Sequence, residues 1–322
     1  MLAALDTAIP ARRIASPNPW VGVVILSADG EVVARGTTEA PGGRHAEVVA
    51  LEAAGPAAAG GTLVTTLEPC VHTGRTPPCT EAIVEAGVRR VVVGVPDPDD
   101  RVAGRGLAAL RNAGLEVVVG VCEEQVGRQL APYLHHRRTG RPFVVCKLAA
   151  TLDGATAAPD GSSRWITGLE ARRDAHRLRA ESDAVLVGAG TVLADDPQLT
   201  VRHVAGPDPR RVVLGRVPAT AKIRPCLEWD GPITDLLDEL GRQGVLQLLV
   251  EGGAAVAGAL HALRLVDRYV LYFAPALLGG SGGHPVLDGA PAPTIEAVWR
   301  GRLVGVTTLG EDLRVELEPH RG

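Results

Sequence analysis

Aromatic residues are scarce in this chain of 322 residues. Its 4 Trp, 3 Tyr and 2 Phe make up 3% of the sequence, whereas hydrophobic residues of all kinds make up 46%. The hydrophobic cores must therefore consist mainly of Val, Leu, Ile and Ala. No apolar run approaches the ~20 residues that a membrane-spanning helix needs, and the early acid Asp6 argues against a secretory signal.

Neither an excess of one charge nor a disulfide pattern is present. The chain has 33 Lys and Arg against 37 Asp and Glu, a formal net charge of −4, and no basic tail or patch indicates nucleic acid as a partner. The five cysteines are odd in number and scattered, apart from the pair at 70 and 79. This usage favours metal binding in a reducing compartment. We therefore expect a cytoplasmic protein that binds neither nucleic acid nor membrane.

Strands and helices alternate along the chain, whose length suggests two domains of roughly 100–200 residues each. The polar stretch 134–142 ends in Gly and Pro and is interpreted as the boundary, which gives domains 1–141 and 142–322. The first is expected to be an α/β layered domain with mostly parallel strands, and the second a sheet covered by helices. The predicted strands and helices of the first are a hairpin of 21–26 and 32–34, strands 62–67, 90–95 and 115–121, and helices 45–54, 81–86 and 105–113, with Thr80 as the cap of 81–86. Those of the second are strands 143–149, 184–188, 211–214, 245–250 and 268–275, a final pair around Gly310, and helices 169–180, 232–241 and 254–262.

The most informative residues of the first domain are His45, Glu47, Cys70 and Cys79. One imidazole and two thiols supply three ligands to a zinc ion and leave the fourth tetrahedral position open for water, as in catalytic sites. Glu47 is not needed as a ligand and is free to move protons. Each element alone has an ordinary explanation, because His-x-Glu is common at helix starts and cysteine pairs often only pack. In combination, at strand-to-helix junctions, they predict a zinc-dependent deaminase.

His45 and Glu47 converge only at the first turn of a helix. Residues two apart are about 200° apart around a helix axis, but side chains lean toward the N-terminus and meet ahead of it. Cys79 is expected just before the next helix, so that two helix N-termini stabilise the thiolates.

Eight residues separate the two cysteines, in place of the two of the general zinc deaminase signature. The segment EPCVHTGRTPPC at 68–79, together with SPNPWVG at 16–22, closely resembles the riboflavin-biosynthesis deaminase–reductase family. The resemblance implies a cytidine-deaminase-like three-layer domain that deaminates a phosphoribosylated diaminopyrimidine. It implies that His45, Cys70 and Cys79 hold Zn²⁺, that Glu47 is the proton carrier, and that the substrate pocket is lined by Asn18, His72 and Arg75. The alternative for the last two is a structural loop.

The second domain contains a strand followed by Gly252–Gly253 and a helix start, where backbone N–H groups can approach a phosphate. It lacks the full GxGxxG fingerprint, so a Rossmann domain is not supported. Six segments resemble the reductase domain of the same family, in order: KLAATLDG at 147–154, SRWIT at 163–167, GTVLADDP at 190–197, LTVR at 199–202, VEGG at 250–253 and APALLGG at 274–280. The resemblance implies a fold similar to dihydrofolate reductase and reduction of a ribosyl group to ribityl by NADPH.

The family's cofactor-binding and substrate-binding positions can be transferred motif by motif. The NADPH contacts implied in this way are Ala149, Trp165, Thr191, Asp195 and the turn from Gly253. The implied substrate contacts are Ser163, Arg179, Leu199, Arg202 and Glu251, and the two arginines suit a phosphate. Lys147 and Asp153 are further polar candidates near the nicotinamide, with a structural ion pair as the alternative.

The chain departs from the family between about residues 215 and 244, where a further strand and loop are expected to be shortened. Arg216 is a candidate for the 2′-phosphate of NADPH, or an ordinary exposed arginine. The main hypothesis is a bifunctional enzyme for two consecutive steps toward riboflavin. The alternatives are an active deaminase whose impaired reductase-like domain serves binding or assembly, and a zinc-stabilised scaffold without chemistry. By analogy with the family we expect a homo-oligomer.

Overall fold

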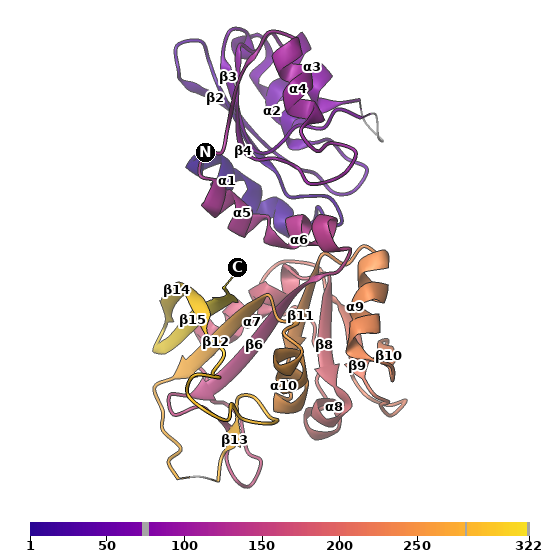
Figure 1. The fold of residues 1–322 in the computed structure, drawn as a ribbon, viewed down its shortest axis with the longest axis vertical. Helices are drawn as coiled ribbons and strands as arrows, with labels where there is room; N and C mark the ends of the chain where they lie inside the picture. Colours follow the sequence, from indigo (N-terminus) through magenta and orange to yellow (C-terminus); the bar gives the residue numbers. More distant parts are fainter. Residues whose placement is uncertain (73–76, 281, 321–322) are drawn as a thin grey trace. The chain divides into compact units, whose positions relative to one another are not determined.

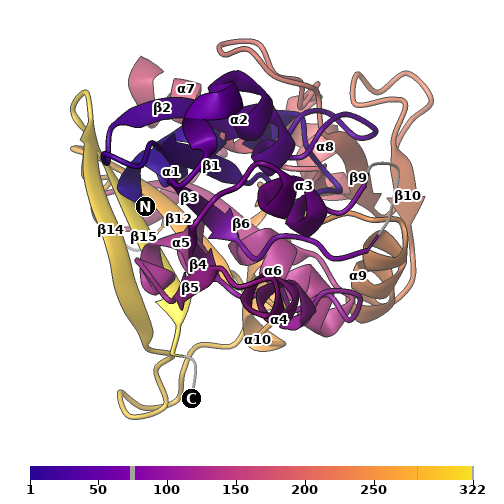
Figure 2. The same ribbon diagram turned by 90° about the horizontal axis from the view of Figure 1, so that it is seen from above.

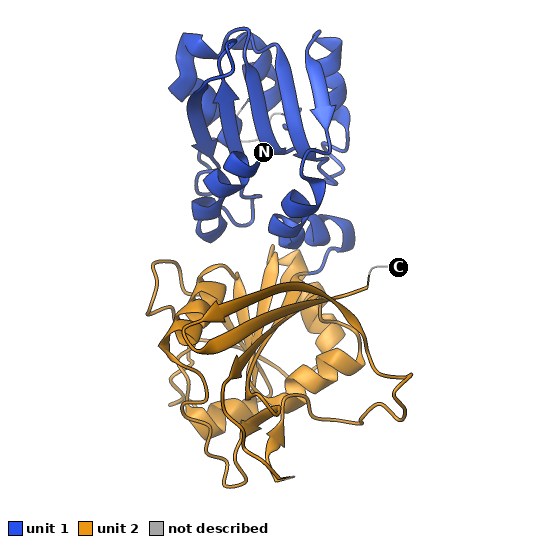
Figure 3. Ribbon diagram, turned by 90° about the vertical axis from the view of Figure 1, so that its left-hand side faces the viewer, with its two compact units in different colours: residues 1–141 blue, residues 142–322 orange. Residues whose placement is uncertain are grey.

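The computed structural model describes residues 1–72, 77–280 and 282–320. The chain divides into two compact units, residues 1–141 and 142–322 (Figure 3). None of the helices in the described ranges has the length and apolar character that crossing a membrane requires.

Unit 1 is built on a five-stranded sheet of order β2-β1-β3-β4-β5. β1 pairs with β2 and β3 in antiparallel fashion, whereas β3–β4 and β4–β5 are parallel. The sheet is therefore mixed. Because β2 and β3 are both antiparallel to β1, four of its five strands run in the same direction and β1 is the reversed one, so the expectation of mostly parallel strands is confirmed. The strands are β1 (Gly22–Leu26), β2 (Val32–Thr37), β3 (Thr62–Leu67), β4 (Arg90–Val95) and β5 (Glu116–Val119).

Two glycines show how helices cover both faces of this sheet. A Cβ on Gly22 would lie 2.0 Å from the backbone oxygen of Ala4 in α1, and one on Gly36 would lie 2.3 Å from that of Ala46 in α2. Val23 is paired with Gly36, and successive residues of a strand face opposite sides, so Gly22 and Gly36 lie on opposite faces. α1 and α2 thus pack closely on the two sides of a three-layer domain (Figure 1).

The remaining helices of unit 1 follow the same division. Gly94 of β4 faces Val126 of α5, on the α1 side, while Ile83 of α3 and Leu110 of α4 are fully buried. The helices are α1 (Leu2–Ala8), η1 (Ile9–Arg13), α2 (Ala46–Ala54), η2 (Gly55–Ala58), α3 (Cys79–Glu85), α4 (Arg105–Asn112), α5 (Glu123–Gln129) and α6 (Ala131–Thr139).

Unit 2 contains an eight-stranded sheet of order β10-β9-β8-β11-β6-β12-β15-β14. The first six strands are parallel, and the long β14–β15 hairpin closes one end in antiparallel fashion (yellow in Figure 1 and Figure 2). The strands are β6 (Phe143–Thr151), β8 (Ala184–Gly188), β9 (Arg210–Leu214), β10 (Leu227–Trp229), β11 (Gln247–Glu251), β12 (Arg268–Ala274), β14 (Gly301–Leu309) and β15 (Asp312–Pro319); β7 (Ala155–Ala157) and β13 (His284–Pro285) form a separate ribbon.

Helices cover this second sheet on both faces. On one face α9 and α10 bury Leu236, Leu240 and Leu260 against Cys146 and Leu248 of the sheet. On the other face lies α7, whose Asp174 accepts a hydrogen bond of 2.6 Å from Tyr272 of β12. The helices are α7 (Leu169–Ala180), α8 (Ala189–Asp195), α9 (Ile233–Arg242) and α10 (Ala254–Ala262).

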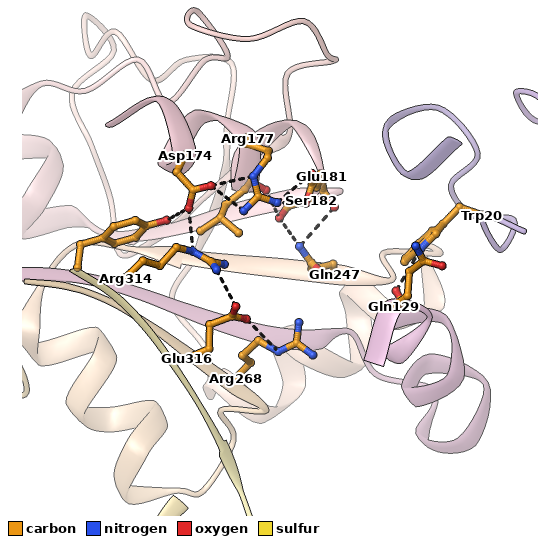
Figure 4. A network of polar contacts seen from close by, with 12 residues as sticks. Trp20, Gln129, Asp174, Arg177, Glu181, Ser182, Gln247, Arg268, Arg314 and Glu316 are labelled. Carbon is orange, nitrogen blue, oxygen red and sulfur yellow. Dashed lines mark hydrogen bonds and ion pairs between the residues drawn. The ribbon is translucent and has the colours of Figure 1, made fainter. Parts of the chain in front are cut away.

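A partly buried charged network fixes α7 to the sheet (Figure 4). Asp174 pairs with Arg177 at 2.7 Å and with Arg314 of β15 at 2.8 Å, and Arg314 also pairs with Glu316 at 2.6 Å. At the end of α7, the side chain of Gln247 in β11 donates to Ser182 at 2.8 Å. Because these polar groups are satisfied inside the protein, the position of α7 is closely specified.

Several elements differ from the sequence-based expectations. Thr80 does not cap α3, because Pro78 is its N-cap and Cys79 already lies in its first turn. The polar stretch 134–142 is helical as far as Thr139, since the buried Tyr133 and Leu134 anchor α6. The shortened passage after β9 retains the short strand β10. A helix that was not predicted, α8, begins at Ala189 and covers most of the GTVLADDP motif at 190–197.

Candidate functional site

Three potential metal ligands meet at one edge of the sheet of unit 1. His45 Nδ1 lies 3.1 Å from Cys79 Sγ and 3.5 Å from Cys70 Sγ, and the two sulfur atoms are 3.4 Å apart. A tetrahedral zinc ion with ligands at ~2.0–2.3 Å has edges of ~3.3–3.8 Å. Two of the three separations lie in this range and the third is about 0.2 Å shorter, so a small outward shift of the His45 and Cys79 side chains accommodates zinc. All three ligand atoms lie within 4.8 Å of one another.

The sheet topology explains why these residues converge. β1 is antiparallel to β2 and β3, so the start of β1 meets the ends of β2 and β3, and β4 ends at the same edge. His45 is the N-cap of α2 after β2, Cys70 follows β3, and Cys79 begins α3. The backbone N–H of Cys79 donates to Cys70 Sγ at 3.3 Å, which favours the thiolate that metal binding requires.

The ionisable groups of this edge are mutually perturbed. The hydrogen bond with Cys79, followed by that with His45, lowers the pKa of Cys70 to about 4, whereas the pKa of the buried Cys79 is raised. Contact with Cys70 raises the pKa of His45. Burial, and then the charge of Cys70, raise the pKa of Glu47 to about 6. Glu47 is 4% exposed in the first turn of α2, two residues from His45, as the predicted convergence requires.

The candidate substrate residues of unit 1 are placed with unequal detail. Asn18 is half-buried and lies four residues before β1, in the segment that leads to the ligand-bearing edge. His72 lies two residues after Cys70, and its Nδ1 is buried without a hydrogen-bond partner in the part of the chain that the structure describes. An unpartnered buried nitrogen beside a metal site is consistent with a ligand contact. Arg75 lies outside the described residues.

Glu68 organises this edge, and sequence reasoning assigned it no role. Its buried carboxylate accepts backbone hydrogen bonds from Asp97 at 3.2 Å, Gly104 at 3.1 Å and Leu107 at 3.2 Å. It therefore ties the loop after β4 and the start of α4 to the strand that leads into Cys70. A glutamate placed between a buried strand and a Pro-Cys turn is the signal from which this role could have been predicted.

In unit 2 the candidate residues on strands share one face. Lys147 of β6 is paired with Glu251 of β11, and Ala149 is paired with Tyr272 of β12. All four lie on the α7 face, by the alternation of side chains along a strand. Burial lowers the pKa of Lys147, and its ammonium lies 5.7 Å from the centre of the Tyr272 ring.

Arg179 and Glu251 form a buried ion pair at the end of β11. Nε and Nη2 of Arg179 donate to the carboxylate at 2.5 and 2.8 Å, and Nη1 donates to the backbone oxygen of Thr200 at 3.1 Å. Burial is the largest single effect and acts to raise the pKa of Glu251, but the charge and hydrogen bonds of Arg179 together with the charge of Lys147 outweigh it, and the pKa is lowered. Arg202, in contrast, is exposed and bonds the neutral side chains of Gln198 and Thr200.

The glycine turn lies against α8. Gly252 and Gly253 have φ of +90° and +71°, which favours glycine, and a Cβ on either would lie 3.0–3.1 Å from Thr191. Asp195, at the end of α8, pairs with Arg164 at 3.1 Å and so draws the neighbouring Ser163 and Trp165 to this edge. Thr191 and Gly253 are thus in contact at the start of α8, and Arg164 links the segment that carries Ser163 and Trp165 to the other end of α8. Trp165 is 71% exposed.

Other candidates are engaged locally. Asp153 accepts hydrogen bonds from Thr151 and from the backbone N–H of Leu278 and Gly279, so it holds a loop and does not pair with Lys147. The alternative of a Lys147–Asp153 ion pair is therefore wrong. Arg216 pairs with Asp230 at 2.6 Å, as an exposed strand-end arginine.

Comparisons with known proteins agree for both units. The family model described as cytidine and deoxycytidylate deaminase zinc-binding region matches residues 1–95, and the RibD C-terminal domain matches residues 142–315. The riboflavin biosynthesis protein RibD of Mycobacterium tuberculosis is 42% identical, over 98% of this chain and 95% of that protein. The Escherichia coli protein of the same name is 40% identical, over 87% and 88%.

Solved structures extend the similarity to the fold. Acinetobacter baumannii RibD superimposes with a TM-score of 0.91 and 38% identity, covering 99% of this chain and 98% of that one. A diaminohydroxyphosphoribosylaminopyrimidine deaminase/5-amino-6-(5-phosphoribosylamino)uracil reductase from Thermotoga maritima gives a TM-score of 0.89 and 35% identity, covering 99% and 97%.

A zinc-binding deaminase region and a reductase domain in one chain define a bifunctional deaminase–reductase. The chain belongs to the RibD family of riboflavin biosynthesis proteins. The predictions of the family, of the two α/β fold classes, and of an enzyme with hydrolase and oxidoreductase domains that use zinc and NADPH are confirmed.

Proposed function

We propose that this enzyme deaminates 2,5-diamino-6-(5-phosphoribosylamino)pyrimidin-4-one in domain 1–141 and then reduces the ribosyl group to ribityl in domain 142–322. The observation that carries the proposal is the convergence of His45, Cys70 and Cys79 beside the buried Glu47. The name of the Thermotoga maritima structure, which matches nearly the whole chain, contains both reactions.

The deaminase site contributes a metal cradle and a proton carrier. His45, Cys70 and Cys79 would hold zinc, which when bound supplies a water of lowered pKa. Glu47 exchanges protons near neutral pH, since its pKa is about 6. It takes a proton from the attacking water and delivers it to the ring nitrogen beside the amino-bearing carbon. It then takes the proton of the newly added hydroxyl group and delivers it to the amino group, which leaves as ammonia when the C–N bond breaks and the carbonyl forms. His72, whose buried Nδ1 has no hydrogen-bond partner among the described residues, and Asn18 are proposed to contact the substrate at this edge, and Arg75 is proposed as a partner of the phosphate.

The reductase site spans the ends of the parallel strands, where ligands of open α/β sheets bind. NADPH supplies the hydride when bound. The turn at Gly253, with Thr191, Asp195, Trp165 and Ala149, is proposed to bind NADPH. Ser163, Leu199, Arg202 and the Arg179–Glu251 pair are proposed to bind the substrate, with Lys147 beside them.

The competing hypothesis of an impaired reductase is less well supported. The family model spans residues 142–315, including the shortened passage. In that passage Ile223 is fully buried, β10 extends the sheet beside β9, and Lys222 pairs with Asp196 at 3.1 Å after α8. A packed segment of this kind can still form one wall of a cofactor site.

A two-stage assay tests the proposal. The purified zinc-loaded protein receives its pyrimidine substrate, and ammonia release is measured; NADPH is then added and its absorbance is followed. The proposal expects ammonia first and NADPH oxidation second. Ammonia release without NADPH oxidation would support the hypothesis of an impaired reductase. The absence of both ammonia release and NADPH oxidation would support the hypothesis of a scaffold without chemistry.

Location and assembly are part of the same proposal. The free cysteines at 70, 79, 122, 146 and 226 support a reducing, cytoplasmic compartment. Family membership supports a homo-oligomer, and light scattering on the eluting protein gives its mass directly.

A further inference from the structure

The segment 198–203, between α8 and β9, contains Leu199 and Arg202 but no helix or strand. Leu199 is 5% exposed and has φ of +52°, a left-handed conformation that surrounding contacts must hold in place for a leucine. Side chains from outside the segment provide such contacts. Arg179 donates to the oxygen of Thr200, and the N–H of Val201 donates to Asp208 at 2.7 Å.

The third contact comes from His176. The backbone N–H of Arg202 donates to His176 Nδ1 at 3.1 Å, and the imidazole is 5% exposed. His176 lies three residues before Arg179 on α7, so both side chains project from the same face of the helix toward the segment. An Nδ1 that accepts a hydrogen bond belongs to a neutral ring that carries its proton on Nε2.

The surroundings of His176 keep this ring neutral. Burial, followed by the charges of Arg179, His203 and Arg202, lowers its pKa to about 4, against a smaller opposing effect of Glu251. His203 packs edge-on against the ring, with 4.5 Å between ring centres. The acceptor is therefore available throughout the neutral range.

We propose that His176 is a positioning residue of the reductase site, which holds the backbone of Arg202 so that its guanidinium meets the substrate phosphate. The proposal rests on the proposed function of the reductase domain. Of the two candidate arginines, Arg179 is already occupied by Glu251, whereas Arg202 is exposed and bonds neutral groups. The charged network that fixes α7 gives His176 a rigid base (Figure 4).

The test compares substitutions at His176 in the full-length, zinc-loaded enzyme. His176→Phe keeps a ring but removes the acceptor, and we expect its KM for 5-amino-6-(5-phosphoribosylamino)uracil to rise roughly tenfold, the usual effect of one lost hydrogen bond. kcat, the KM for NADPH and ammonia release should change less than about twofold, and inhibition by ribose 5-phosphate should weaken with the substrate KM. His176→Asn, whose oxygen replaces Nδ1, should restore the KM. His320→Asn, at an exposed histidine that follows β15 in the same unit, is the control and is expected to stay close to wild type.

The outcomes separate this inference from the proposed function. Wild-type protein that does not oxidise NADPH would overturn the proposed function and the inference with it. An active wild type with an unchanged substrate KM in His176→Phe would overturn the inference alone, as would an equal loss of NADPH affinity, which indicates a merely structural role. If His176→Phe does not fold, His176→Gln takes its place. The glutamine side chain is one methylene longer than that of asparagine, so its oxygen does not lie at the Nδ1 position, and the KM of His176→Gln should exceed that of His176→Asn.

Discussion

The two units assemble their sites in different ways. In unit 1 a few side chains meet within 3.1–3.5 Å of one another, on two helix starts and a strand end. In unit 2 the candidate residues are spread over strand ends, a glycine turn and an irregular segment. At the glycine turn the backbone itself is proposed to bind the cofactor. Metal coordination needs particular side chains at fixed spacing, whereas binding of an extended cofactor distributes the contacts. The first kind of site is therefore readable from short motifs, and the second depends on the fold.

The largest expected effect separates the two activities through Glu47. Glu47→Gln should keep zinc and reduce ammonia release about 10²- to 10⁴-fold, the usual contribution of a general acid–base group. Zinc content by elemental analysis and NADPH oxidation with supplied deaminated substrate should match wild type. Turnover close to normal would remove Glu47 from the mechanism.

The converse experiment uses the buried pair in unit 2. Glu251→Gln leaves the guanidinium of Arg179 without its anion, which costs about 3 kcal/mol of unfolding free energy, as for other broken buried pairs. Reductase kcat/KM should fall at least tenfold, roughly the factor that 1.4 kcal/mol represents. Ammonia release should not change. A matched control is Glu170→Gln, which breaks only the exposed pair with Arg173. Equal losses in the two variants would contradict the prediction.

A packing variant tests whether α2 positions the zinc ligands. Gly36→Ala places a methyl group 2.3 Å from the backbone oxygen of Ala46 and 2.5 Å from the nitrogen of Ala50, so α2 must move. We expect a loss of about 2 kcal/mol in stability and weaker zinc binding, with the reductase intact. Gly127→Ala, in helix α5 with open space around it, is the control and should be neutral or slightly stabilising. Zinc titration and thermal unfolding provide the measurements.

The smallest effect is a pH dependence confined to unit 1. Burial raises the pKa of Asp97 to about 6, although Tyr133 donates a hydrogen bond to it. The folded state therefore binds this proton more tightly than the unfolded state, whose pKa is about 3.9, and unfolding free energy falls as pH rises from about 4 to 6. In the wild type this proton contributes up to about 2 kcal/mol to the difference in unfolding free energy between pH 4.5 and pH 7, and Asp97→Asn should remove that contribution. Urea titrations at pH 4.5 and 7 measure it, with the exposed Asp29→Asn as control; parallel slopes in all three proteins would refute it.

The sequence predicted the ligand-bearing edge of unit 1 because its residues follow regular elements. Strand 62–67 was placed at the observed bounds of β3, and a helix beginning at His45 was expected where α2 begins one residue later. The cap of α3 was misplaced because a Thr two residues after a Pro resembles an N-cap, although Pro78 has the capping position. The helix α6 was missed since nine residues show too little periodicity against a charged C-terminal half.

In unit 2 the sequence identified motifs but not their contacts. His176 was invisible because its partner is a backbone N–H twenty-six residues away, and no pattern of residue types encodes such a bond. The occupation of Arg179 by Glu251 was equally hidden, because the two residues lie 72 positions apart and meet only through the strand order of the sheet. Long-range contacts of this kind require the topology.

The ends of the segment between Cys70 and Cys79 are tied to each other directly. The N–H of Thr80 donates to the oxygen of Cys70 at 3.2 Å, and that of Cys79 donates to Cys70 Sγ. These two contacts fix the positions of the two thiol ligands relative to each other. For protein engineering the two cysteines are therefore fixed anchor points, and we expect segments of other sequence placed between them to leave the three zinc ligands in position.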